Sequence, residues 1–311
     1  MIQKNKIKTN NGIIAGLVVS LVLIWTGFYL SYPNFFRLQQ KAEQITKQEI
    51  EEQEEINKIL AFGHLELEAR AFAVYNLETS ELVIGHNEEL VWPLASITKM
   101  MTALVTSEKL NPQTIITINQ ITNTNNGGLW PGERWSRANL TALTLVSSSN
   151  DGATALAEQV DTGQDNFADL MNERSVALGL TDFHFTNPTG LDDGPTPGGQ
   201  GSALSVAKLM AYIIKNQPEL LLATREPMVE EKSLDNFNHT VLNTNEVVND
   251  LPGLLASKTG YTDRAGGNLA IVANLGLHRP IAIVVLGSSQ EGRFTDTKEL
   301  VRATLNYYSN Q

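Results

Sequence analysis

The chain of 311 residues contains no cysteine, and this absence removes several classes of chemistry. Disulfide bonds, thiolate nucleophiles and cysteine-ligated zinc are all excluded. Histidine is scarce, with five copies that show no metal-ligand spacing, so neither a metal nor a cofactor is expected. Lysine and arginine together number 23 against 34 aspartates and glutamates. The resulting net charge of −11 offers no basic field, which argues against nucleic acid as a partner.

Long hydrophobic runs are also missing, except for one near the amino terminus. Residues 13–30 carry no charge, and as a helix they measure about 27 Å, close to the ~30 Å of a bilayer core. Three lysines precede this run, which favours an amino terminus left in the cytoplasm. The alternative is a cleaved signal peptide, but the bulky sequence FYLSYPNFF at the end of the run has no small-residue cleavage site. We therefore expect a cytoplasmic tail over 1–12 and an uncleaved transmembrane signal-anchor over 13–30.

The next part of the chain has neither glycine nor proline between residues 37 and 60 and is rich in Gln, Glu and Lys. This composition predicts a helix. Its apolar residues, among them Leu38, Ile45 and Ile56, keep no steady heptad, so a solvated stalk is favoured over a coiled-coil dimer. We expect a helical stalk over 31–65 and one domain over 66–311. The topology implied is a single-pass protein of the cell membrane with an extracytoplasmic domain.

Within residues 66–311 the patterning changes along the chain. Residues 70–87 read as two strands around a polar turn. Strands return after residue 252, and a final helix covers 296–309. Four helical patterns lie between, over 96–110, 137–160, 166–180 and 203–216. We predict an α+β fold in which both chain ends build one antiparallel sheet and a helical subdomain is inserted, leaving a cleft beside the sheet edge.

A serine and a lysine three positions apart, Ser96 and Lys99, lie in the first helical pattern. On a helix these two side chains share a face. A desolvated lysine loses its preference for the charged form and can take a proton from a neighbouring hydroxyl. The spacing alone is weak, because Ser205 and Lys208 repeat it and a lysine beside a serine is usually a snorkelling surface residue.

Two further motifs give the spacing its meaning. Ser148-x-Asn150 lies between two helical patterns, where a plain N-cap is the simpler interpretation, and Lys258-Thr259-Gly260 precedes a strand-like run. In the order S-x-x-K, S-x-N, K-T-G, these motifs are the catalytic set of penicillin-binding proteins and serine β-lactamases. The pair at 205 and 208 is excluded because no S-x-N follows it before the K-T-G.

The motifs belong to longer stretches that match one family: ASITKMMTAL, PGERW, SSNDGATALAE, LGLTDFHFTNPTGLDD, KTGYTDRAGG and VVLGSSQEGRF. With them, residues 66–311 resemble the D-alanyl-D-alanine carboxypeptidases of the low-molecular-weight penicillin-binding protein class. The resemblance implies a β-lactamase/transpeptidase-like fold. It also implies a serine peptidase that removes the terminal D-alanine from peptidoglycan pentapeptide stems through an acyl-enzyme. The implied partners are peptidoglycan stem peptides, β-lactam antibiotics as covalent inhibitors, and the membrane through the amino-terminal helix.

The expected catalytic roles follow from this resemblance and agree with the chemistry of each side chain. Ser96 is the nucleophile, Lys99 in its neutral form is the general base, and Ser148 relays a proton towards the leaving amine. Asn150 is expected to hold Lys99 and the substrate amide in place. The backbone N–H groups of Ser96 and Tyr261 are the expected oxyanion hole.

The remaining expected site residues bind the substrate. Lys258 adds positive charge to the cleft, and Thr259 offers a hydroxyl to the substrate carboxylate. Gly260 is expected to let the substrate strand approach the backbone closely. In the resembled family an arginine after the following strands reaches the terminal carboxylate, and Arg293 takes that place here.

The chain also departs from the family pattern in two places. Ala256 stands where the family usually has glycine, and Ser205 stands where it usually has aspartate, changes expected to affect the rim of the cleft. A D,D-endopeptidase with identical motifs stays an alternative. A serine β-lactamase is a weaker one, because class A enzymes need a further glutamate and the stretch TDFHFTNPTG has none. A non-catalytic module would have lost a motif residue, and a Ser-His-Asp hydrolase on another fold would show G-x-S-x-G; neither applies.

Overall fold

The computed structural model describes residues 33–122, 127–160, 164–276 and 279–309. The expected tail over 1–12 and signal-anchor over 13–30 lie outside these residues. Among the residues that are described, none of the helices combines the length and the apolar character needed to cross a bilayer. The chain divides after Ile59 into two units, which are taken separately below.

Helix α2 (Pro33–Phe62) contains the described residues of the first unit and continues into the second from Leu60, and the helix predicted over 37–60 is confirmed. Its apolar side chains Leu38, Ile45 and Ile56 are exposed. Ion pairs one turn apart, such as Lys47–Glu51, line its surface. Each such pair stabilises a helix by only about 0.2–0.5 kcal/mol, so the helix depends mainly on a composition free of glycine and proline.

The second unit is built on a five-stranded sheet with the order β10-β11-β12-β1-β2, in which all neighbours are antiparallel. The strands are β1 (Ala71–Asn76), β2 (Glu81–His86), β10 (Leu254–Thr262), β11 (Gly266–Asn274) and β12 (Pro280–Ser288). The predicted hairpin over 70–87 is confirmed as β1 and β2, and both ends of the domain contribute to the sheet as expected. Strand β10, which carries the K-T-G, forms one edge of the sheet.

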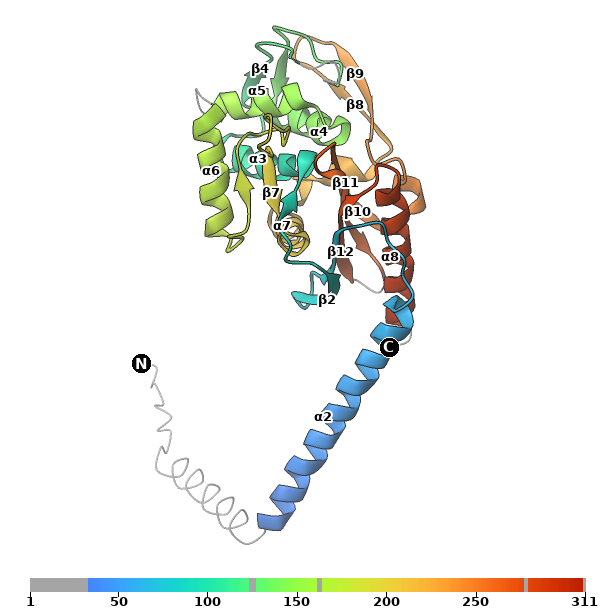
Figure 1. Cartoon of the computed structure of the whole chain (residues 1–311). Coiled ribbons are helices and arrows are strands. Elements are labelled where there is room, and N and C mark those ends of the chain that lie inside the picture. The colour runs from blue at the N-terminus through green and yellow to red at the C-terminus, as the bar shows by residue number, and fades with distance from the viewer. Residues whose placement is uncertain (1–32, 123–126, 161–163, 277–278, 310–311) are drawn as a thin grey trace, which may run out of the picture. The chain divides into compact units, whose positions relative to one another are not determined.

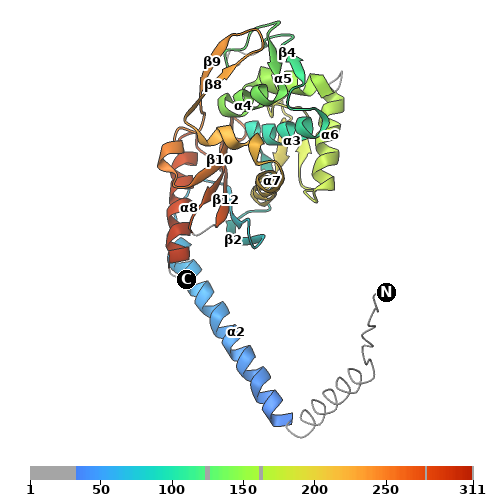
Figure 2. The ribbon, with the colours of Figure 1, turned by 180° about the vertical axis from the view of Figure 1, so that it is seen from behind.

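The two faces of this sheet are covered by different helices. Along β12, residues 282, 284 and 286 join a core cluster with α7 (Ala203–Asn216), while residues 281, 283 and 285 join another with α8 (Gly292–Ser309). This alternation is the period of two that a strand buried on both faces requires. Figures 1 and 2 show α7 and α8 on opposite sides of the sheet. Phe62, which lies after the division at Ile59 and so belongs to the second unit, packs against Tyr307 of α8 in the second cluster.

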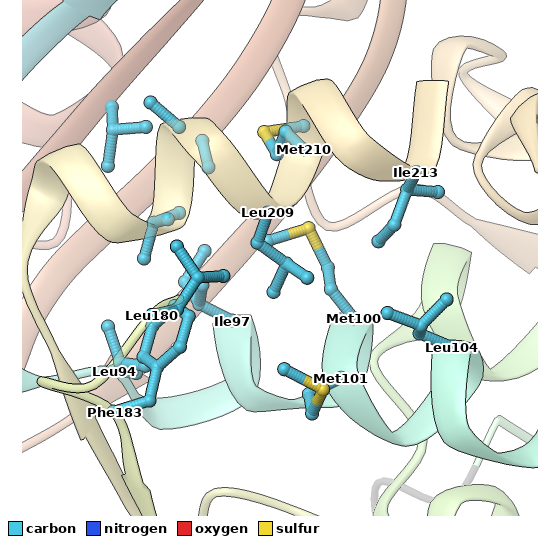
Figure 3. Packing of buried hydrophobic residues seen from close by; sticks show 14 of the residues in the cluster. Leu94, Ile97, Met100, Met101, Leu104, Leu180, Phe183, Leu209, Met210 and Ile213 are labelled. Carbon is cyan, nitrogen blue, oxygen red and sulfur yellow. The ribbon is translucent and has the colours of Figure 1, made fainter. Parts of the chain in front are cut away.

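The inserted helical part lies between β2 and β10. Besides α7, its helices are η1 (Ala95–Thr98), α3 (Lys99–Lys109), α4 (Arg137–Ser147), α5 (Asn150–Val160), α6 (Gln164–Ala177), η2 (Pro218–Leu220), η3 (Leu222–Arg225) and η4 (Val248–Asp250). The four predicted helical segments are confirmed, with the segment over 137–160 divided at Ser148 into α4 and α5. Figure 3 shows Met100 and Leu104 of α3 facing Leu209 and Ile213 of α7, so α3 is fixed to the layer that covers the sheet.

Three small sheets complete the domain and were missed by the sequence analysis. They are formed by β3 (Trp92–Pro93), β7 (Gly199–Gly201) and β6 (His184–Phe185); by β4 (Ile115–Thr117) and β5 (Arg134–Ser136); and by β8 (Met228–Lys232) and β9 (Asn238–Leu242). Strands of two to five residues are too short for an alternating pattern to stand out from loop sequence.

Candidate active site

The side chain of Lys99 lies at the centre of the site. It is 1% exposed, and its Nζ lies 2.8 Å from Ser96 Oγ, 2.7 Å from Asn150 Oδ1 and 2.7 Å from the carbonyl oxygen of Thr189. Burial, followed by the positive charge of Lys258, lowers the pKa of Lys99 well below its ordinary value. A pKa shift in this direction favours the neutral amine that a general base needs.

Ser96 is placed by a short 3-10 helix rather than by the α-helix that the sequence suggested. It lies in η1, and α3 begins only at Lys99. In a 3-10 helix residues i and i+3 are nearly eclipsed, so the predicted contact between the two side chains is preserved. Ala95, just before the serine, has a φ of 48°, a strained value for a residue with a side chain. Such strain persists only where the surrounding structure fixes it.

A turn that begins at Asn187 contacts both Lys99 and the backbone just before Ser96. Asn187 Oδ1 accepts hydrogen bonds from the backbone N–H groups of Thr189 and Gly190, which aims the Thr189 carbonyl at Lys99. Gly190 has a φ of 80°, and a Cβ there would lie 1.9 Å from the carbonyl oxygen of Ala95. Thr189 is therefore a site residue that the sequence analysis missed, although the Asn-Pro-x-Gly turn signal was present.

The S-x-N motif lies where α4 ends and α5 begins. Ser148 has a φ of 60°, and its N–H donates to the Thr144 carbonyl as the C-cap of α4. Ser149 Oγ accepts from the N–H of Gly152, so Ser149 is the residue that caps α5. The alternative interpretation of Asn150 as a plain N-cap is wrong, because α5 includes it and its side chain reaches Lys99.

The K-T-G motif brings a second buried amine to the site. Lys258 is 1% exposed, and its Nζ donates to Ser148 Oγ at 3.0 Å and to the Thr259 carbonyl oxygen at 3.0 Å. Burial, with the positive charge of Arg293, lowers the pKa of Lys258 to about 7. The hydroxyl of Thr259 lies 2.6 Å from that of Thr244, another residue the sequence analysis did not identify.

The end of β10 is held against the nucleophile by Gly260. A Cβ on this residue would lie 2.6 Å from the Leu94 carbonyl oxygen and 3.2 Å from the backbone nitrogen of Ser96. The space saved by the missing side chain is thus taken by the protein's own backbone, not by a substrate strand as the sequence suggested. The same contact places the N–H of Ser96 beside β10, and Tyr261, which is 43% exposed, follows directly.

Arg293, on the first turn of α8, completes the positive cluster. It is 6% exposed, its Nη1 donates to the Gly260 carbonyl at 3.1 Å, and its Nε has no hydrogen-bond partner among the described residues. Burial lowers the pKa of Arg293, an effect opposed by Glu246, Glu291 and Tyr261. Two cationic side chains, Lys258 and Arg293, therefore lie close together in a protein of net charge −11, which concentrates attraction for an anion at this place.

Ser205 and Lys208, which repeat the S-x-x-K spacing, lie outside the hydrogen-bonded site, as does Ala256, which departs from the family pattern. Ser205 Oγ donates to Asp182 Oδ1 at 2.5 Å near the start of α7, and Lys208 is exposed. Ala256 is fully buried in the core cluster that includes α7. None of these side chains joins the hydrogen bonds around Ser96, so the two departures leave the central geometry unchanged.

Comparison with known proteins gives one family. The family model described as D-alanyl-D-alanine carboxypeptidase matches residues 57–290. The D-alanyl-D-alanine carboxypeptidase DacD of Escherichia coli is 31% identical over 255 residues, which cover 76% of this chain and 63% of that protein. This chain thus spans less than two thirds of the length of that relative.

Two further similarities concern function and fold. A D-alanyl-D-alanine endopeptidase of Pseudomonas aeruginosa is 28% identical over 247 residues, covering 76% of both chains. The solved structure of penicillin-binding protein D2 from Listeria monocytogenes, in its ampicillin-bound form, is 27% identical with a TM-score of 0.69. It covers 77% of this chain and 98% of that one.

Proposed function

The chain belongs to the D-alanyl-D-alanine carboxypeptidase family, and we propose that it removes the terminal D-alanine from peptidoglycan pentapeptide stems through an acyl-enzyme on Ser96. The observation that carries this proposal is the buried amine of Lys99, which lies within hydrogen-bonding distance of the Ser96 hydroxyl and has a lowered pKa.

The partners of Lys99 determine where its lone pair points. A neutral amine has two N–H donors and one lone pair, and three oxygens surround it here. The carbonyl oxygens of Thr189 and Asn150 can only accept. Only the Ser96 hydroxyl can donate, so the lone pair of the neutral amine faces the proton that must leave. The fold thereby aims the base at the nucleophile before any substrate binds.

Acylation and deacylation then use the same groups in turn. Ser96 Oγ forms a bond to the carbonyl carbon of the penultimate D-alanine while its proton passes to Lys99. The carbon–nitrogen bond breaks, and the leaving amine receives a proton through Ser148, which contacts Lys258. A water molecule next attacks the ester and gives a proton to Lys99; the bond to Ser96 Oγ breaks, Lys99 returns the proton to that oxygen, and the stem leaves as a carboxylic acid that ionises. The N–H groups of Ser96 and Tyr261 are proposed to stabilise the oxyanion in both halves.

The substrate's terminal carboxylate is proposed to lie between Thr259 and Arg293, at the end of β10. Strand β10 is a sheet edge, and an edge can accept an extended peptide as an additional strand. The positive charges of Lys258 and Arg293 then select a peptide that ends in a free carboxylate. A β-lactam carries a carboxylate next to its reactive amide, and we propose that it acylates Ser96 in the same position.

A D,D-endopeptidase that cuts cross-links is the second candidate, because a relative of similar coverage has that name. Such a substrate continues beyond the scissile bond instead of ending in a terminal D-alanine. The full activity, like the substrate, is a proposal, since this chain spans only part of the length of the first carboxypeptidase relative.

The location of the protein is also a proposal, and it rests on the sequence alone. The uncharged run over 13–30, preceded by Lys4, Lys6 and Lys8, supports a single-pass anchor with the catalytic domain outside the cytoplasm. That position would give the domain access to peptidoglycan.

Mass spectrometry of a muropeptide digest tests the proposal. The chain is incubated with a pentapeptide-bearing muropeptide, and we expect loss of one alanine from the stem with Ser96→Ala as the inactive control. Cleavage of a cross-linked dimer without trimming of the monomer would support the endopeptidase instead. An unchanged pentapeptide and an intact dimer would refute both.

A further inference from the structure

A second hollow lies outside the catalytic site, between the β8–β9 hairpin and the loop that leads into β5. Its volume is about 760 Å³, within the range of ~300–1,000 Å³ that is usual for ligand sites. It is lined by Gly127, Gly128, Trp130, Pro131, Gly132, Glu133, Asp235, Phe237, Asn238, His239 and Thr240. Figures 1 and 2 both show β8 and β9 beside β4 at one end of the helical part.

The hollow displays two large aromatic side chains to solvent. Trp130 is 66% exposed and Phe237 is 56% exposed, although each would gain by burial. Asn238 and Thr240 also belong to the lining, and both are exposed on the face of β9 opposite to the buried His239. Flat apolar rings beside neutral hydrogen-bonding groups suit a pyranose, whose C–H face packs on an aromatic ring while its hydroxyl and acetamido groups take hydrogen bonds.

The floor of the hollow is rigid. His239 and Glu133 are buried, and His239 Nε2 lies 2.6 Å from Glu133 Oε1. The other carboxylate oxygen of Glu133 accepts from the N–H of Trp130 at 3.2 Å, and the ring of Trp135 packs on His239 at 4.9 Å. The backbone that carries the exposed tryptophan is therefore fixed by a buried pair. A fixed platform loses little entropy when a ligand binds.

The charges of the hollow favour a neutral ligand over an anion. Its lining contains two carboxylates and, among the described residues, no lysine or arginine. The guanidinium of Arg134, which follows Glu133 in the chain, already donates to Asp235 Oδ1 from Nε at 3.0 Å and from Nη2 at 2.7 Å. An N-acetylated sugar whose acid group is consumed in an amide has no charge to conflict with this lining.

The hollow is joined to the catalytic site by β9. Four residues beyond Thr240, the Thr244 hydroxyl contacts that of Thr259. Four residues of extended chain cover about 13 Å. In a five-residue stem whose penultimate residue lies at Ser96, four residues lead from Ser96 to the glycan, and they extend over at most about 14 Å. The glycan attached to a bound stem would therefore lie about as far from the K-T-G as the hollow does.

We propose that this hollow is a glycan subsite, in which Trp130 and Phe237 bind an N-acetylated sugar of the peptidoglycan strand that carries the stem. The proposal rests on the proposed function for the identity of the strand. It gives the β8–β9 hairpin a role in substrate binding, and the reaction at the catalytic motifs does not depend on that role. The occupancy of the hollow by sugar makes a glycan-linked stem a better substrate than the same peptide alone.

The test compares two substrates and one non-substrate with the full-length chain. We expect kcat/KM to be higher for the tetrasaccharide-linked pentapeptide than for the free pentapeptide. Trp130→Ala and Phe237→Ala should each reduce that preference by about two- to tenfold, the usual worth of an aromatic contact, with the rate on free pentapeptide unchanged. Trp130→Phe should keep most of it. Leu242 is an exposed residue of the same hairpin that does not line the hollow, so Leu242→Ala is the matched control.

Saturation-transfer NMR with the peptide-free tetrasaccharide separates this proposal from the catalytic one. Transfer to the sugar that is lost in Trp130→Ala but kept in Leu242→Ala supports the subsite, even for a chain that releases no alanine. Three results would overturn it: no transfer from the wild type, equal rates on the two substrates, or equal losses in Leu242→Ala and Trp130→Ala.

Discussion

Replacing Arg293 by alanine should reduce trimming of D-Ala-D-Ala peptides by an amount that depends on pH. The guanidinium is 6% exposed and donates to the Gly260 carbonyl, so it lies where the terminal carboxylate is proposed to bind. A charge-assisted hydrogen bond contributes roughly 1.5–3 kcal/mol, which corresponds to a loss of about ten- to 150-fold in kcat/KM. This full loss is expected at pH 6, where Lys258 is charged in both proteins.

At higher pH the loss should become smaller, for a reason that the structure supplies. Arg293 is one cause of the lowered pKa of Lys258, about 7, so its removal raises that pKa. At pH 8 only about a tenth of the wild-type Lys258 is charged, whereas the variant retains more of this charge. The basic limb of kcat/KM, which reports the free enzyme, should therefore move to higher pH in Arg293→Ala.

The assay is the pH profile of D-alanine release from a pentapeptide, with two further variants. Arg293→Lys keeps the charge but not the fork and should recover part of the rate. Arg264→Ala removes an exposed arginine from the turn after β10 and should change nothing. If Arg293→Ala trims the pentapeptide at the wild-type rate, Arg293 does not bind the carboxylate. A loss that is equal at every pH would show that Arg293 and Lys258 are not coupled.

Three other predictions follow from the same site and from the amino terminus. Fluorescent penicillin should label the wild type covalently and Ser205→Ala equally, whereas labelling that persists in Ser96→Ala would refute the assignment of the nucleophile. Lys258→Met should raise Tm at pH 6, and it should raise Tm by less at pH 10. The pKa of this lysine is about 7 in the folded protein and near 10.5 in the unfolded chain, so the stability of the wild type rises with pH between those values. A gain in Tm that is independent of pH in a thermal melt would contradict this. The mature protein should retain residues 1–30 and remain with membranes after a high-salt wash, and a soluble form beginning beyond residue 30 would reveal cleavage.

The sequence was sufficient for those parts of the fold and site that depend on local pattern. The hairpin over 70–87, the late strands and the main helices have clear periodicity, and three short motifs located Ser96, Ser148 and Lys258. The order of these motifs carried more information than any one of them, because Ser205 with Lys208 has the same spacing and lies outside the site.

What the sequence did not reveal depends on contacts between distant segments. The Thr189 carbonyl is a backbone group, and no side-chain pattern marks it as a partner of Lys99, 90 residues away. Thr244 is a common residue whose importance comes only from its contact with Thr259. Gly260 was identified, but the atoms that occupy its space could be known only from the packing of β10 on η1.

The sheet that unites both ends of the domain also determines when the protein can become active during its synthesis. Ser96 and Lys99 are synthesised early. Lys258, however, donates a hydrogen bond to Ser148, 110 residues before it, and Asn268 of β11 donates to the Pro93 carbonyl, 175 residues before it. Contacts of such high sequence separation form late, because the loop-closure entropy must be overcome first. A nascent chain that ends before β10 therefore has its nucleophile and base but neither the second amine nor the strand against which η1 packs. Reactivity towards D-Ala-D-Ala peptides should appear abruptly as the last strands are added, so that an incomplete chain carries an inert serine.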